Sequence, residues 1–285
     1  MVYWCIMRYQ NPSPAGDEAE PCEVLMEEKR KARSDPEGLI EGRNAVTEAL
    51  RAGTAVDKVW LARGEESGPL RRIAALARSA GAVVVEADRR KLDAMSVTGA
   101  HQGVIAMTAA QKYAEVPDLL RAAEERGEAP LLVVCDEISD PHNLGAIIRS
   151  AECAGAHGVI IPKRRSAGLT AVVAKASAGA LAYLPVARVP NIPALLKDLK
   201  KRGLWIYGAD ASGTASLYET DWTGPAALVI GAEGSGMTRL AAEQCDFLVR
   251  IPMKGSINSL NASTACAVLL YEAVRQRDGH HRTSG

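Results

Sequence analysis

The chain has 285 residues, and its 34 lysines and arginines balance its 34 aspartates and glutamates, giving a formal net charge of zero. This length predicts one large or two ordinary domains, and 47% hydrophobic with 24% charged residues is typical of a soluble globular protein. The balance excludes a uniformly basic nucleic-acid binder but is compatible with a local basic patch. The cluster Lys163–Arg164–Arg165 is the favoured patch, because it follows a predicted strand.

Targeting and metal signals are absent from the sequence. No apolar run approaches the length of a membrane span, and the stretch 1–7 is too short for a signal peptide, so we expect a cytoplasmic protein without a membrane partner. The six cysteines show no C-x-x-C pair and no metal-ligand spacing, so we expect no metal. Cys135, Cys153 and Cys266 lie in apolar patterns and are predicted to be reduced core residues.

Residues 1–37 differ from the rest of the chain. The segment 11–16 is rich in turn residues, and 27–33 is almost entirely charged. We expect a flexible N-terminal extension here, and Met26 is an alternative start of translation.

Residues 38–110 carry a compact α/β pattern. Apolar residues spaced i, i+3, i+4 and i+7 from Leu70 to Ala77 predict a helix, and further helices are expected around 46–50 and at 89–95. The predicted strands are 58–62, 82–85 and 103–107. Residues 111–130 are predicted to be a linker with one amphipathic helix.

Residues 131–285 are predicted to form a second, parallel-sheet domain. The run 131–135 is continuously apolar, as expected for a parallel strand buried on both faces. Further strands are predicted at 158–161, 184–189, 205–207, 226–230 and 248–251. A helix after the first strand buries a stripe from Leu144 to Ala151 and leaves Arg149 on its other side. The last helix, 262–276, buries Ala262, Cys266, Leu269, Leu270 and Ala273.

Three polar or glycine-rich loops follow strands of this domain, and open α/β proteins bind ligands at the carboxyl ends of their strands. The first holds Asp136 and 140–145, the second is 231–237 and the third is 252–263. Their patterns are N-x-G-x-x-x-R, I-G-x-E-x-x-G and I-P-M…S-L-N-x-S. The matching residues are Asn143, Gly145 and Arg149; Ile230, Gly231, Glu233 and Gly236; and Ile251, Pro252, Met253, Ser259, Leu260, Asn261 and Ser263.

These motifs, in this order, resemble the SpoU/TrmH family of RNA ribose 2′-O-methyltransferases, a branch of the SPOUT class. The resemblance implies an α/β fold whose parallel-sheet domain contains a deep trefoil knot. It also implies a small RNA-binding domain before it, similar to the ribosomal-protein L30e fold. It is most similar to enzymes that methylate a guanosine of large-subunit rRNA, and it implies a homodimer.

The resemblance also implies the site. S-adenosylmethionine is expected at Gly231, Ile251, Met253 and Leu260, and the expected catalytic residues are Arg149, Asn143, Glu233, Ser259 and Asn261. Because arginine stays protonated in proteins, we expect Arg149 to clamp a phosphate or stabilise alkoxide charge, with Glu233 orienting its guanidinium. Ser259 and Asn261 are expected to bond the ribose or phosphate. The group that removes the hydroxyl proton stays open.

Three alternatives are left. The substrate is tRNA instead of rRNA, or the chain is a non-catalytic RNA-binding protein of the same fold, or it is a nucleotide-dependent oxidoreductase. The last is disfavoured because the loop 231–236 lacks the G-x-G-x-x-G order and residue Ser256 stands where an acidic residue is needed. His142 is a weaker candidate for a base, with turn capping as its other reading.

Overall fold

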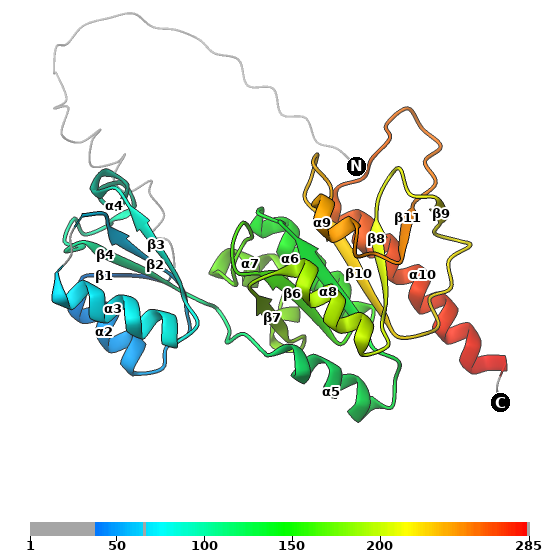
Figure 1. The fold of residues 1–285 in the computed structure, drawn as a ribbon, viewed down its shortest axis with the longest axis horizontal. Helices are drawn as coiled ribbons and strands as arrows, with labels where there is room; N and C mark the ends of the chain where they lie inside the picture. Colours follow the sequence, from blue (N-terminus) through cyan, green and yellow to red (C-terminus); the bar gives the residue numbers. More distant parts are fainter. Residues whose placement is uncertain (1–37, 65–66, 284–285) are drawn as a thin grey trace, which may run out of the picture. The chain divides into compact units, whose positions relative to one another are not determined.

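The computed structural model describes residues 38–64 and 67–283, which form the two sheets drawn in Figure 1. The predicted extension, 1–37, lies outside the described residues. In the part of the chain that is described, no helix combines the length and apolarity needed to cross a membrane.

The first sheet has four strands in the order β1-β4-β2-β3. They are β1 (Leu39–Glu41), β2 (Val56–Ala62), β3 (Val83–Ala87) and β4 (Val104–Thr108). β2 and β3 are parallel, and the other pairs are antiparallel. The accompanying helices are α2 (Arg43–Arg51), α3 (Gly68–Ser79) and α4 (Arg89–Met95). Val46, Val59 and Ile73 lie in the core between α2, α3 and the sheet.

The second sheet has seven strands in the order β7-β6-β5-β10-β8-β11-β9, and every neighbouring pair is parallel. They are β5 (Leu131–Asp136), β6 (Gly158–Pro162), β7 (Val186–Val189), β8 (Trp205–Ala209), β9 (Ala215–Ser216), β10 (Ala226–Gly231) and β11 (Phe247–Arg250). β5, β6 and β10 are buried at every residue, which explains their continuous apolar sequences. The α/β fold predicted for this segment is confirmed.

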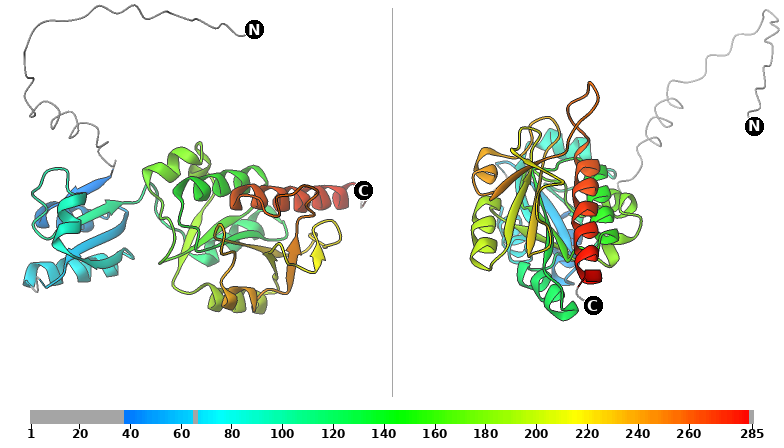
Figure 2. Two further views of the ribbon diagram at one scale, coloured as in Figure 1. Left: turned by 90° about the horizontal axis from the view of Figure 1, so that it is seen from above. Right: turned by 90° about the vertical axis from the view of Figure 1, so that its right-hand side faces the viewer.

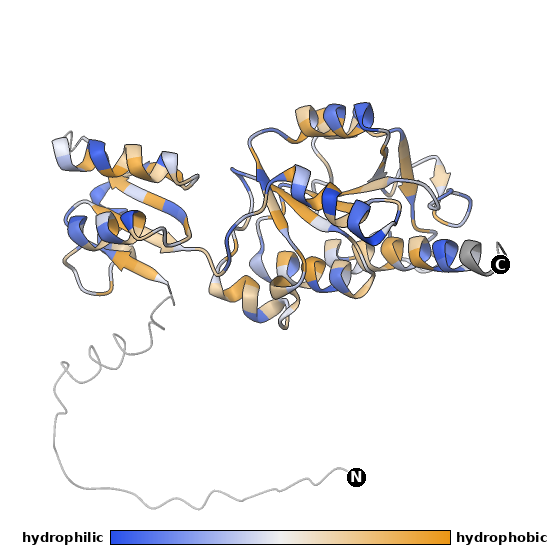
Figure 3. Cartoon of the chain, turned by 90° about the horizontal axis from the view of Figure 1, so that it is seen from below, coloured by the Kyte–Doolittle hydropathy of each residue, from blue (hydrophilic) through white to orange (hydrophobic). Residues whose placement is uncertain are grey.

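Helices cover both faces of this sheet, as the right-hand view of Figure 2 shows. They are α5 (Val116–Arg126), α6 (Pro141–Cys153), α7 (Ala171–Ala176), α8 (Ile192–Lys201), α9 (Arg239–Ala242) and α10 (Ala262–Thr283), with a short 3₁₀ helix at Ala180–Ala182. α6, α7 and α10 share one core with the sheet, and α5, α8 and α9 share the other. Figure 3 shows largely apolar strands and helices in which apolar and hydrophilic residues alternate.

The predicted buried stripe of α10 is confirmed, and Cys135 and Cys266 are buried. The prediction for Cys153 is wrong: it ends α6 on the solvent side and is exposed. Residues 116–126 of the predicted linker form α5, whose Leu119 is fully buried in the core of the second sheet. The trefoil knot stays a prediction.

The C-terminal part of α10 is fastened by Arg277. Its guanidinium donates hydrogen bonds to the backbone carbonyls of Trp222, Ala129, Pro130 and Gly224, at 2.7 to 3.2 Å. These carbonyls precede β5 and β10, so the bonds tie α10 to the amino ends of the two central strands. The helix is thereby held in place for the site that lies at its other end.

His157 directly precedes β6 and is almost fully buried, and its side chain joins this strand to the start of β5. Its Nδ1 accepts the amide hydrogen of Leu131 at 3.1 Å, so Nε2 carries the proton and donates to the carboxylate of Glu128 at 3.1 Å. Burial, together with the positive charge of Arg126, lowers the pKa of His157 below its ordinary value.

We therefore expect stability to fall on mild acidification. A histidine whose pKa is lower in the folded state contributes stability above its unfolded pKa of about 6.5, and this is lost as the pH falls below that value. The urea midpoint should be lower at about pH 5.5 than at about pH 7.5. In His157→Gln, which keeps a donor and an acceptor but does not titrate, the difference should be smaller. If the urea midpoint changed with pH equally in the unaltered protein and in His157→Gln, the pH dependence could not be assigned to His157.

Candidate active site

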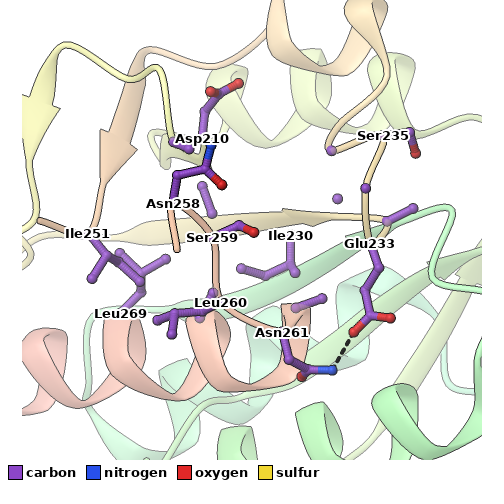
Figure 4. Close-up of a pocket in the computed structure, with 18 of the residues that line it drawn as sticks. Asp210, Ile230, Glu233, Ser235, Ile251, Asn258, Ser259, Leu260, Asn261 and Leu269 are labelled. Carbon is purple, nitrogen blue, oxygen red and sulfur yellow. Dashed lines mark hydrogen bonds between the residues drawn. The ribbon is translucent and has the colours of Figure 1, made fainter. Parts of the chain in front are cut away.

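A cavity of about 650 Å³ opens where β8, β10 and β11 end, at the carboxyl edge of the second sheet. The loop after β10 forms one wall and the segment 258–262 another (Figure 4). Ile230, Ile251 and Leu269 supply apolar side chains, while the glycine-rich loop exposes backbone groups. An apolar slot with a few polar groups suits a planar ring carrying hydrogen-bonding edges.

All four residues predicted to hold the cofactor line this cavity: Gly231, Ile251, Met253 and Leu260. Gly231 is required by a close approach of backbone segments. A Cβ atom at this position would overlap the carbonyl carbon of Gly236 and the amide nitrogen of Met237. The loop returns on itself there, because Ala232 and Gly236 exchange two backbone hydrogen bonds at 3.0 and 2.9 Å.

Three residues from the three motifs meet beside the cavity. The Asn261 side-chain nitrogen donates to Oδ1 of Asn143 at 2.9 Å and also to Oε1 of Glu233, the bond drawn in Figure 4. The Asn261 side-chain oxygen accepts from the amides of Ser263 and Thr264 at the start of α10. Asn261 therefore joins α6, the loop after β10 and α10 in one network.

Local structure explains why Asn143 reaches this network. The carboxylate of Asp140 accepts the amide hydrogens of His142 and Asn143, both at 3.2 Å, and so caps α6. The buried Asn143 lies in the first turn of the helix. A Cβ at Gly145 would overlap Ala176 of α7, so the glycine of the first motif allows the two helices to pack closely. His142 has an exposed side chain, and its amide takes part in the cap.

Asp136 fixes the glycine-rich loop from the neighbouring strand. It is buried at the end of β5, and its Oδ2 accepts the amide hydrogen of Thr238 at 2.6 Å. Because Thr238 also caps α9, this bond holds the far end of the loop that begins at Gly231. The predicted grouping of Asp136 with the motif residues is present.

Arg149 and Ser259 lie outside the network. Ser259 lines the cavity with an exposed side chain, whereas Arg149 is exposed on α6 and does not line it. Within residues 38–64 and 67–283, Arg149 has no hydrogen-bond or ion-pair partner. The expectation that Glu233 orients Arg149 is wrong for this structure, because the Glu233 carboxylate bonds to Asn261 instead.

Three polar residues of the cavity, Asp210, Ser235 and Asn258, were not predicted. Asp210 and Asn258 line it away from the Glu233–Asn261 pair, as Figure 4 shows. Oδ1 of Asp210 accepts from the amide and hydroxyl of Ser212, both at 2.7 Å. The position of Asp210 directly after β8, at the carboxyl edge, was the available signal.

No group of three or more potential metal ligands occurs among the residues that the structure describes. The polar side-chain groups at the cavity are two amides, two hydroxyls and two carboxylates that come from separate loops.

Sequence comparisons bear on the same two segments. Residues 130–271 match the SpoU rRNA Methylase family, and residues 39–114 match the RNA 2′-O ribose methyltransferase substrate-binding family. A Bacillus subtilis protein, the TrmH family tRNA/rRNA methyltransferase YacO, is 48% identical over 245 residues, covering 86% of this chain and 98% of that protein. The chain belongs to the SpoU/TrmH family.

Solved SpoU/TrmH structures agree with this assignment. The SpoU methyltransferase AviRb from Streptomyces viridochromogenes, in complex with AdoMet, is 30% identical with a TM-score of 0.55, covering 85% of this chain and 90% of that one. An AdoMet-bound rRNA methyltransferase from Sinorhizobium meliloti is 25% identical with a TM-score of 0.53, covering 88% and 90%. The first sheet is thus part of a SpoU/TrmH substrate-binding domain, and the second carries the methyltransferase fold.

RNA ribose 2′-O-methylation with S-adenosylmethionine as methyl donor is the activity of the SpoU/TrmH family. The residues present fit that donor. The cavity combines apolar side chains, which suit an adenine ring, with the glycine-rich loop from Gly231 to Gly236. The polar network of Asn143, Glu233 and Asn261 lies at one side of the slot.

Proposed function

We propose that this protein methylates the ribose 2′-hydroxyl of a guanosine in large-subunit rRNA. The observation that carries the proposal is the network of Asn143, Glu233 and Asn261 beside a cavity suited to S-adenosylmethionine. The match to the SpoU rRNA Methylase family, and a relative named as an rRNA methyltransferase, support ribosomal RNA. The name of the Bacillus subtilis relative keeps tRNA as the second candidate.

In this reaction the ribose 2′-oxygen would accept the methyl group, and its hydroxyl proton would pass to solvent. Bound S-adenosylmethionine supplies the electrophilic methyl group. Arg149, exposed and unpaired among the described residues, would hold the adjacent phosphate or the developing negative charge on the 2′-oxygen. Ser259, whose side chain lies at the cavity, would hydrogen-bond the ribose or its phosphate.

Asn261 takes the part of a positioning residue in this proposal. Both hydrogens of its side-chain amide are used by Asn143 and Glu233, and its oxygen caps α10. It therefore holds the loops in a fixed geometry before substrate arrives, which lowers the reorganisation needed in the transition state. Glu233 and Asn143 keep further acceptor and donor positions for the nucleotide.

The test is mass spectrometry of nucleosides after incubation of purified protein with labelled S-adenosylmethionine and unmethylated RNA. Label in 2′-O-methylguanosine from a large-subunit rRNA transcript is the expected result. Label found only in tRNA nucleosides would show that the substrate is tRNA and not rRNA. RNA binding without transfer to either substrate would favour the non-catalytic alternative.

We also propose that the protein is a cytoplasmic homodimer. Val268 and Tyr271 support an interface on α10, because both are exposed large hydrophobic side chains on the helix that borders the cavity. Light scattering at micromolar concentration should give the mass of two chains, and Tyr271→Glu should shift it towards one. A single-chain mass for the unaltered protein would contradict the proposal.

A further inference from the structure

The most deeply buried ion pair of the described chain joins the two sheets. Arg188 on β7 and Asp57 on β2 approach to 2.5 Å between Nη1 and Oδ1, and both side chains are only 6% exposed. Nη2 of Arg188 donates to the carbonyl of Gly81 at 2.6 Å. Burying two charges is costly unless their geometry and remaining hydrogen bonds are well satisfied. This contact therefore holds Asp57 of the first sheet in a defined position against Arg188 of the second.

Tyr113, between β4 and α5, completes the contact. Its ring lies 4.0 Å from the guanidinium carbon of Arg188, a cation–π geometry. Its hydroxyl donates to Oδ1 of Asp57 at 2.6 Å and accepts from the amide of Leu169 at 3.0 Å. A Cβ at Gly168 would overlap the Asp57 carboxylate, so the loop after β6 also closes on this carboxylate. We call Asp57, Tyr113 and Arg188 the polar lock.

A hollow of about 140 Å³ adjoins the polar lock and is lined from both sheets. Its lining includes the basic residues Lys58, Lys163, Arg164 and Arg165. Arg165 pairs with Glu137 at 3.1 Å, and Lys58 stands over the Trp60 ring at 5.5 Å. The one acidic residue of the lining, Asp57, is neutralised by Arg188.

The charge and position of the hollow point to its ligand. Lys163 and Arg164 are exposed and directly follow β6, so they leave the same carboxyl edge of the sheet at which the cofactor cavity opens. Ammonium and guanidinium groups are the usual partners of backbone phosphates, and a hollow far smaller than the cofactor cavity suits a phosphate better than a nucleoside.

We propose that this hollow binds a backbone phosphate of the substrate RNA, and that the polar lock positions it. The inference rests on the proposed function, since it takes RNA as the substrate. Lys163 and Arg164 supply the binding charges. Arg188 acts through Asp57, keeping Lys58 and the loop after β6 on opposite sides of one phosphate. The site gives the RNA a second attachment besides the ribose that is methylated.

The first test removes the binding charges in Lys163→Gln/Arg164→Gln. Affinity for a fluorescent large-subunit rRNA transcript, measured by anisotropy at low salt, should fall about 10-fold or more. The slope of log affinity against log salt should become shallower by roughly 0.7–0.9, because one phosphate contact is lost and each contact contributes about that much. Affinity for S-adenosylmethionine should not change. Lys197→Gln/Lys201→Gln on α8 removes the same charge from exposed positions and should leave the slope unchanged.

The second test removes the polar lock as a pair, in Asp57→Asn/Arg188→Met, so that no unpaired charge stays buried. A shallower salt slope with a raised KM for RNA and a preserved kcat is expected. A lower melting temperature with an unchanged salt slope would show that the polar lock only stabilises the fold, and would overturn its positioning role.

If the unaltered protein binds and methylates RNA while Lys163→Gln/Arg164→Gln keeps full affinity and slope, the phosphate site is overturned and the proposed function stands. If the unaltered protein binds no RNA, both fail.

Discussion

Replacing Arg149 with alanine is expected to lower the rate of methyl transfer by about 100-fold or more, because removing one group that stabilises developing charge typically has this effect. S-adenosylmethionine affinity should be unchanged, since Arg149 does not line the cavity. Its lack of a partner among the described residues leaves the guanidinium available for the substrate. Single-turnover rates together with calorimetric binding of the cofactor measure the two effects separately.

Arg149→Lys distinguishes charge from shape. Lysine keeps the positive charge but loses the planar fork that bonds two oxygens at once. If the fork holds the phosphate, lysine should restore little of the rate. Near-normal turnover in the lysine variant would show that a point charge is enough, and unaltered turnover in the alanine variant would remove Arg149 from the mechanism. Lys197→Ala, another exposed cation on a helix of the same domain, serves as the control.

The second large effect is expected from Gly231→Val, which should abolish measurable S-adenosylmethionine binding. The reason is a clash within the protein. The added side chain would overlap the backbone of Gly236 and Met237, so the loop after β10 has to open. Residues 231–236 line the cavity, so opening this loop removes one wall of the cofactor site.

Calorimetry with the cofactor and thermal unfolding monitored by circular dichroism together test this. Binding should disappear while a cooperative transition and the α/β spectrum persist, since the clash lies between the last residue of β10 and the loop that follows it. Gly224→Ala is the matched control, because a Cβ there meets nothing within 4 Å and the residue does not line the cavity. Unchanged affinity in the valine variant would show that the cofactor does not use this loop.

The sequence predicted the second sheet well because its central strands are buried on both faces. Continuous apolar runs such as 131–135 allow few other readings, and β5 begins at the predicted residue. Strand β7 begins at Val186, two residues later than predicted, because Pro185 has no amide hydrogen for the ladder. Strand β9 has two residues and helix α9 has four, which is too short for any periodic pattern.

The site was predictable in its members and less so in its contacts. The three motifs identified Asn143, Glu233 and Asn261, but the bonding partner of Glu233 depends on how the loop after β10 folds. Loop conformation is set by contacts far apart in the sequence, such as that between Asp136 and Thr238. Asp210 escaped prediction because it follows a strand without belonging to any of the three patterns.

Helix α10 serves the cavity and the proposed subunit contact at the same time. Ala265 and Leu269 line the cavity, while Val268 and Tyr271 lie on its exposed side. A shift of this helix on association would therefore change the cofactor site as well. Thermodynamic linkage is reciprocal, so any such coupling makes cofactor affinity depend on protein concentration and makes dimer dissociation depend on cofactor. In the cell, the supply of methyl donor would then regulate the fraction of assembled enzyme.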